Sequence, residues 1–228
     1  DEYDKLNQRV QDNQALGCYY FEKRQFEKAI EEFNKALKFN PQSEDIYQTL
    51  GFCYKELRKF DKAMKEFERV LKINQKNKQG YLGFGFCYLE QGNIKKAINE
   101  FNQVLALDSN NEHAHHGLGS CYQENKQFKE AVTEFKHVLK ANPNNEYAHK
   151  DLAYCYENLK QFDKAIDEFI YLINIYPGNE YYHQGLGCCY EGLKQLDRAI
   201  DEFKQVLKIN PDNEQAAKCM ASCYRRYE

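Results

Sequence analysis

The sequence repeats itself every thirty-four residues. A small residue followed three positions later by a tyrosine marks each copy, at Gly17/Tyr20, Gly51/Tyr54, Gly85/Tyr88, Gly119/Tyr122, Ala153/Tyr156, Gly187/Tyr190 and Ala221/Tyr224. A fixed period of this length is typical of arrays in which each unit packs only against its neighbours. The 228 residues are therefore expected to form a stack of small units without one central core.

Each copy has the pattern of a helix, a short turn and a second helix. In 112–145, apolar residues recur at helical spacing up to Tyr122 and again from Phe128 to Leu139, with a polar break between them. The second helix is expected to end at Asn142–Pro143, because proline lacks the donor that a continuing helix needs. Glutamates are expected to open the first helices, where a carboxylate suits the positive end of the helix dipole, at Glu44, Glu112, Glu146, Glu180 and Glu214.

Other repeated residues read as core. An alanine and a phenylalanine four positions later recur in the second helix, at Ala29/Phe33, Ala63/Phe67, Ala97/Phe101, Ala131/Phe135, Ala165/Phe169 and Ala199/Phe203. Six of the nine cysteines keep the same period: Cys53, Cys87, Cys121, Cys155, Cys189 and Cys223. Packed helices lie about 10 Å apart, whereas a disulfide needs Cα atoms within about 7 Å. We expect buried free thiols, which favour a reducing compartment and hence a cytoplasmic location.

The composition argues against several classes of function. With 32 basic and 35 acidic residues, the chain offers no general attraction for nucleic acid or for an anionic membrane surface. No apolar run approaches the roughly 20 residues that a membrane span requires. Because no glycine-rich phosphate loop, nucleophile elbow or zinc-protease motif occurs, we expect neither an enzyme nor a cofactor.

A histidine cluster, His113-x-His115-His116, is a candidate metal site. His115 shares its place in the repeat with His149 and His183, and with Tyr47 and Tyr81 in earlier copies, which indicates helix packing. His113 and His116 could share an ion, but two ligands rarely suffice. No metal site is therefore predicted.

The motif Leu-Gly-x-x-Tyr, then Ala-x-x-x-Phe, then Pro, on a period of thirty-four resembles the tetratricopeptide repeat. The resemblance covers almost the whole chain. It implies an all-α solenoid of antiparallel helix pairs that forms a right-handed superhelix. Residues 1–9 would extend the first helix and 214–228 would be a half repeat or capping helix. Six full repeats would lie between them, at 10–43, 44–77, 78–111, 112–145, 146–179 and 180–213. Gly80, Gly83 and Gly92 are expected to loosen the third repeat.

The resemblance also implies a concave groove, lined by the first helices, that holds a peptide or helix of a partner protein. The inward-facing places of the family include Tyr147 and Tyr181. The candidate partner-binding residues are Gln14, Phe21, Glu22, Gln48, Phe52, Lys55, Glu56, Leu82, Phe86, Leu89, Glu90, His116, Gln123, Glu124, Lys150, Tyr154 and Glu157.

Two features of this set favour an interaction site. An acidic row of period thirty-four, Glu22, Glu56, Glu90 and Glu124, runs beside an apolar patch of Phe21, Phe52, Leu82, Phe86 and Leu89. An exposed apolar patch with a charged rim is typical of a binding surface. We expect a protein segment that carries apolar anchors and Lys or Arg. The alternative is that these side chains pack between adjacent helices and that the glutamates are only solvated.

Three alternatives concern other partners or contexts. The subset of the family that grips a chaperone's C-terminal carboxylate uses Lys, Asn and Arg at places that no three consecutive repeats match here. The half repeat at 214–228 leaves a helix without its pair, which would allow a homo-oligomer. A third alternative is that the array is the regulatory or targeting arm of a larger enzyme. The sequence most strongly predicts a non-enzymatic interaction module or scaffold.

Overall fold

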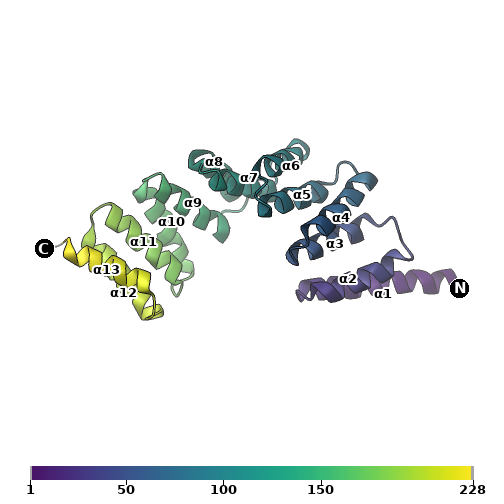
Figure 1. The fold of residues 1–228 in the computed structure, drawn as a ribbon, viewed down its shortest axis with the longest axis horizontal. Helices are drawn as coiled ribbons and strands as arrows, with labels where there is room; N and C mark the ends of the chain where they lie inside the picture. The colour runs from purple at the N-terminus through teal and green to yellow at the C-terminus, as the bar shows by residue number, and fades with distance from the viewer. Residues whose placement is uncertain (1, 227–228) are drawn as a thin grey trace. The chain divides into compact units, whose positions relative to one another are not determined.

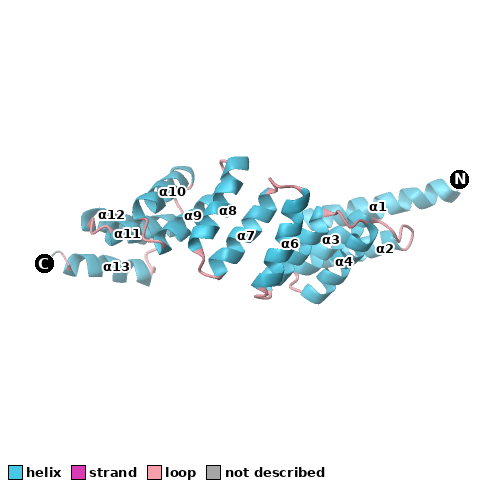
Figure 2. Cartoon of the chain, turned by 90° about the horizontal axis from the view of Figure 1, so that it is seen from above, coloured by secondary structure: helices cyan, strands magenta, loops and turns pink. Residues whose placement is uncertain are grey.

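A computed structural model of the chain describes residues 2–226, with side chains from Val10 onward, and Figure 1 shows its ribbon. Within these residues every regular element is an α-helix, and short loops join one helix to the next (Figure 2). The helices are α1 (Glu2–Glu22), α2 (Phe26–Leu37), α3 (Glu44–Glu56), α4 (Phe60–Ile73), α5 (Lys78–Glu90), α6 (Ile94–Leu107), α7 (Glu112–Glu124), α8 (Phe128–Ala141), α9 (Glu146–Asn158), α10 (Phe162–Ile175), α11 (Glu180–Gly192), α12 (Leu196–Ile209) and α13 (Glu214–Arg225).

The chain divides into two compact units, 1–117 and 118–228. In the first unit α1 packs on α2, α3 on α4 and α5 on α6, and in the second unit α9 packs on α10 and α11 on α12. Consecutive pairs also contact one another within a unit, as α2 contacts α3 and α10 contacts α11. The fold is thus an all-α solenoid of helix pairs, as the sequence predicts.

The repeated alanines and phenylalanines form the core. Each of the six alanines, from Ala29 to Ala199, is fully buried, and the six phenylalanines expose at most 1 % of their surface. The glycine of the repeated glycine–tyrosine pair lies against the phenylalanine of its own repeat. A Cβ added to Gly51 would come within 2.5 Å of the Phe67 ring. Glycine at this place therefore lets the two helices of a repeat approach over the aromatic ring.

Two glycines of the third repeat are sites of close packing. A Cβ at Gly83 would lie 2.3 Å from the ring of Phe67 in the preceding repeat, and one at Gly80 would lie 2.8 Å from Leu71. Both glycines are buried. The expectation that Gly80 and Gly83 loosen this repeat was wrong, because their missing side chains bring α4 and α5 together.

The six periodic cysteines are fully buried and are not joined to one another. Burial raises the pKa of the Cys53, Cys87, Cys121, Cys155 and Cys189 thiols to about 12. A thiol held in its protonated form is a poor nucleophile and a poor metal ligand. The interpretation of the cysteine ladder as small core filler is confirmed.

The loops before the first helices supply N-caps that the glutamates alone did not predict. Asn77 Oδ1 accepts a hydrogen bond from Gly80 N at 2.8 Å, and Asn145 Oδ1 accepts one from Ala148 N at 3.0 Å. Asn111, Asn179 and Asn213 cap in the same way. A side-chain oxygen at this place satisfies a backbone donor that has no partner within the helix. Glutamates begin α7, α9, α11 and α13 one residue after the cap, whereas α5 begins at Lys78.

The turn inside each repeat places a residue in the left-handed region. At the end of α3, Arg58 has φ +56°, its N donates to Lys55 O, and Lys59 N donates to Tyr54 O, both at 2.8 Å. This pair of bonds is the Schellman motif, in which glycine is the usual left-handed residue. The corresponding residues with positive φ are Arg24, Gly92, Lys126, Lys160 and Lys194.

One side chain ties each of five first helices to the loop before it. The side chain lies in the first turn of the helix and bonds to the carbonyl oxygen six residues earlier. Distances are 2.9 Å for Tyr47–Pro41, 3.0 Å for Tyr81–Gln75, 3.1 Å for His115–Ser109, 2.9 Å for His149–Pro143 and 3.1 Å for His183–Pro177. Tyrosine and histidine are interchangeable here because both can donate to a carbonyl.

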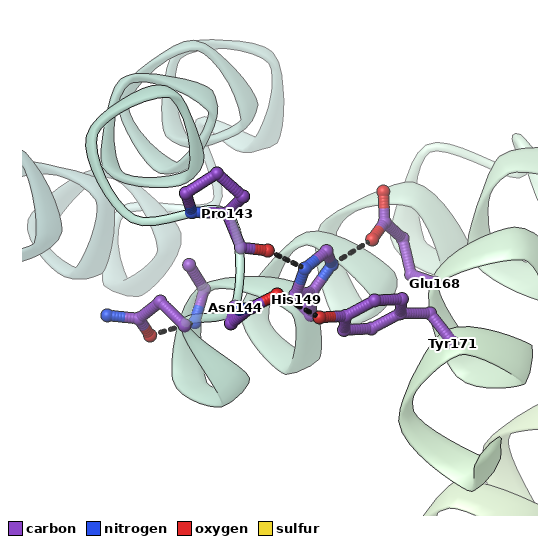
Figure 3. A network of polar contacts seen from close by, with 7 residues as sticks. Pro143, Asn144, His149, Glu168 and Tyr171 are labelled. Atoms are coloured by element: carbon purple, nitrogen blue, oxygen red, sulfur yellow. Dashed lines mark hydrogen bonds and ion pairs between the residues drawn. The ribbon is translucent and has the colours of Figure 1, made fainter. Parts of the chain in front are cut away.

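Two of these histidines make a second bond. His149 Nδ1 lies 2.6 Å from Glu168 Oε2 on α10, and its ring stacks on Tyr171 at 4.0 Å between centroids (Figure 3). His183 pairs with Glu202 on α12 in the same way, at 2.7 Å. The histidine place therefore joins a loop, a first helix and a second helix, which confirms its packing role.

Candidate partner-binding faces

Phe52 and Phe86 occupy equivalent places on α3 and α5, and both are half-buried. The Phe52 ring packs edge-on against Phe67, and the Phe86 ring against Phe101, each with 5.1 Å between centroids. Phe21 is half-buried as well. These rings cover the core with one side and leave only part of their surface accessible to a partner.

The remaining apolar and amide candidates of the first unit are half-buried or buried. Leu82 exposes 1 % of its surface and belongs to the core, so its assignment to an exposed apolar patch was wrong. At this place on α5 the sequence alone could not separate a groove residue from a packing residue. Leu89, Gln14 and Gln48 are half-buried, and Gln48 accepts a hydrogen bond from Asn77 Nδ2 at 3.5 Å.

Two glutamates of the acidic row, Glu56 and Glu90, pair with arginines of the preceding turns. Arg24 Nη2 lies 3.5 Å from Glu56 Oε2, and Arg58 Nη1 lies 3.4 Å from Glu90 Oε2. Lys55 Nζ adds a contact of 2.7 Å to Glu56 Oε1. Glu56 and Glu90 thus carry little uncompensated charge. Exposed ion pairs of this kind contribute at most about 1 kcal/mol each to stability.

The second unit presents a more exposed aromatic face. Tyr147 and Tyr154 lie on α9, and Tyr181 lies on α11; they expose 65 %, 38 % and 49 % of their surfaces. Tyr147, Lys150, Tyr154 and Glu157 follow one another at steps of three and four residues, so they share one face of α9. We call Tyr147, Lys150, Tyr154, Glu157 and Tyr181 the tyrosine face.

Glu157 is the half-buried carboxylate of this face. Burial raises the pKa of its carboxyl. Within residues 10–226 no side chain forms an ion pair or a hydrogen bond with its carboxylate. Burial, and then the negative charge of Glu157, raise the pKa of the Tyr181 phenol on the next first helix.

The one cation of the tyrosine face, Lys150, already has an acidic partner. Lys150 Nζ lies 3.8 Å from Asp151 Oδ1 and 5.4 Å from the centroid of the Tyr147 ring. The carboxylate at the corresponding place of the next repeat, Glu191, has its own partner in Arg226 Nη1 at 3.1 Å. Glu157 and Glu191 therefore hold the same place in consecutive repeats but differ in compensation.

The other candidates are more dispersed. His116 and Gln123 are half-buried, Gln123 accepts a weak bond from Cys155 Sγ at 3.8 Å, and Glu22 and Glu124 are exposed. In the described residues no group of three or more His, Cys, Asp or Glu side chains is arranged to hold a metal ion. No helix there has the length and apolar character to cross a membrane.

Sequence reasoning missed Arg24 and Arg58 as partners of the acidic row. The signal was available, because both recur with the period and each precedes its glutamate by 32 residues. Both arginines lie at the left-handed position of the turn between two helices. A basic residue at that position does not by itself indicate a contact with the next repeat. The candidates Tyr154 and Glu157 are brought together with Tyr181, whose exposure the sequence did not indicate.

Antiparallel helix pairs of thirty-four residues, stacked on alanine–phenylalanine crossings, define an α-solenoid built from helical repeats. Family models described as tetratricopeptide repeat match residues 20–82, 88–138 and 124–189, and a second model of the same description matches 180–213. The chain belongs to the tetratricopeptide repeat family. Among curated proteins, none matches it.

Solved structures share the fold. A chain of the APC/C hetero-tetramer Cut9–Hcn1 has a TM-score of 0.78 and 19 % identity over 96 % of this chain; our chain covers 46 % of it, less than half its length. The Pseudomonas aeruginosa protein pilF has a TM-score of 0.81 and 17 % identity, covering 96 % of this chain and 99 % of its own. YrrB, described as a repeat protein with an unusual peptide-binding site, has a TM-score of 0.70 and 20 % identity, covering 82 % and 96 %.

Proposed function

We propose that this protein is a non-enzymatic interaction module that binds a peptide or helix of a partner protein on the face formed by its first helices. The family is generally an interaction fold, and this supports the class of function. The observation that carries the proposal is the division of labour within each repeat. The periodic alanines, phenylalanines and cysteines lie in the core. Several places that change from repeat to repeat, those of Phe52, Phe86, Tyr147 and Tyr154 among them, keep accessible surface on the first helices.

The tyrosine face supports this proposal most directly. Three tyrosines with 38–65 % of their surface exposed lie on neighbouring first helices of one unit. Tyrosine supplies a large contact area at low cost in side-chain entropy and is enriched where proteins bind one another. Apolar anchors of the partner would pack on these rings. In the first unit, the accessible edges of Phe52 and Phe86 would offer a similar but smaller surface.

The experiment is a selection of displayed random twelve-residue peptides on the intact chain, followed by anisotropy titration of a labelled winner. Tyr154→Ser should weaken binding at least tenfold. Ile170→Ser is the matched control, because Ile170 is an equally exposed apolar residue, at 40 %, on the second helix α10. A selection that enriches no peptide, or binding lost with Ile170→Ser and kept with Tyr154→Ser, would contradict the proposal.

A further inference from the structure

Glu157 is a carboxylate that the chain removes partly from water without supplying a counter-ion. Its side chain is half-buried, and no described Lys, Arg or His pairs with it. A desolvated charge is costly unless it is paired, and Glu191 at the same place of the next repeat is paired with Arg226. The missing element of this site is a cation.

The surroundings of Glu157 restrict which cation fits. Tyr154 lies one turn before it on α9, and Tyr181 is close enough for the Glu157 charge to act on its phenol. The face of a tyrosine ring attracts a cation within about 6 Å of the ring centre. A guanidinium is planar, stacks on aromatic faces and donates two parallel hydrogen bonds to one carboxylate. An exposed tyrosine ring one turn from an unpaired carboxylate thus matches an arginine better than a compact ammonium.

We propose that Glu157 receives the guanidinium of an arginine from a bound protein segment, with Tyr154 and Tyr181 flanking its plane. This inference rests on the proposed function and specifies its ligand. The unpaired negative charge of Glu157 also disfavours the phosphates of a nucleic acid, which would otherwise suit exposed tyrosines.

The same peptide selection tests the inference. The winning peptides should share an arginine, and replacing it by the neutral isostere citrulline should weaken binding to the native chain about tenfold or more, since hydrogen bonds between charged groups are the stronger ones. On Glu157→Gln the arginine and citrulline peptides should bind within about twofold of each other. On Glu191→Gln, the matched control, the difference should persist because Glu191 is already paired.

Stability separates this role from a structural one. Melting of the free protein, followed by circular dichroism, should show Glu157→Gln at least as stable at pH 7 as the native chain. A destabilised variant would mean that the carboxylate has a packing role, and would overturn the inference. So would peptides without arginine, or an arginine preference that survives Glu157→Gln. In those two cases the peptides would still bind the tyrosine face, so the proposed function would stand.

Discussion

Replacing His149 tests whether the contact between loop and helix holds the repeats together. The His149 ring is buried between Pro143 O and Glu168, and it stacks on Tyr171. A carbonyl oxygen only accepts, so Nε2 must donate, and a proton must also lie between Nδ1 and the Glu168 carboxylate. Alanine would remove both bonds and the stacking contact at once, and would leave a partly buried carboxylate without its partner.

The magnitude follows from the contacts. The loop bond contributes about 1 kcal/mol, the charged bond about 1.5 kcal/mol and the ring contact about 0.5 kcal/mol. His149→Ala should therefore lower the free energy of unfolding by about 3 kcal/mol. His149→Tyr should cost about half as much, because Tyr47 and Tyr81 show that a phenol at this place reaches the loop carbonyl at 2.9 and 3.0 Å.

Urea unfolding followed by circular dichroism measures the cost, and hydrogen exchange of the amides in 143–156 locates it. Exchange is needed because repeat arrays can unfold in parts. The control is His113→Ala on α7, an exposed histidine whose replacement should change stability by less than about 0.5 kcal/mol. The reasoning fails if His149→Ala costs no more than His113→Ala, or if tyrosine at 149 is as damaging as alanine.

Three further results are expected. Phe169→Ala should cost about 3 to 5 kcal/mol in urea unfolding, because its ring is 1 % exposed and the surrounding helices cannot close the cavity; a cost below 1 kcal/mol would contradict full burial. Lys126→Gly should stabilise the protein by about 0.5 to 1 kcal/mol, since φ is +59° there and only glycine adopts that region freely; a loss would refute the strain. Burial raises the pKa of Glu157 in the folded state, so its contribution to stability is present below the unfolded pKa of about 4.3 and is lost as pH rises through the folded pKa. The stability advantage of Glu157→Gln should therefore be absent near pH 4 and grow toward pH 7, and an advantage independent of pH would exclude this origin.

The fold was predictable because two independent signals, the apolar pattern within a repeat and its recurrence between repeats, assign the core residues. Phe135 recurs at the same place in every full repeat, and Cys121 in every full repeat except the first, where Tyr19 stands, so both pattern and repetition assign them to the core. The structure buries both completely. Helix ends were also readable, since Pro143 stops α8 at Ala141 and Glu146 begins α9. The caps by Asn145 and its equivalents were not predicted, because the glutamate one residue later already suits the positive end of the helix dipole.

The candidate site was less predictable, because the first helix has one face toward its own repeat and another toward the next. Leu82 and Phe86 lie one turn apart on α5, yet Leu82 is buried and Phe86 only half-buried. Spacing alone cannot rank two such neighbours. Which carboxylates have a counter-ion is harder still to predict from the sequence. Glu90 and Glu157 are both acidic, and only the structure shows that Arg58 pairs with Glu90.

The arginines at the left-handed turns also link one repeat to the next. Repeat 44–77 contains both members of the contact between repeats, since its Glu56 meets Arg24 from the repeat before and its Arg58 meets Glu90 from the repeat after. Tandem copies of this segment would consequently pair with each other without any new residue, whereas Gly92 ends such a chain of pairs. Segment 44–77 is thus self-complementary, and it is the natural module for lengthening this array by duplication.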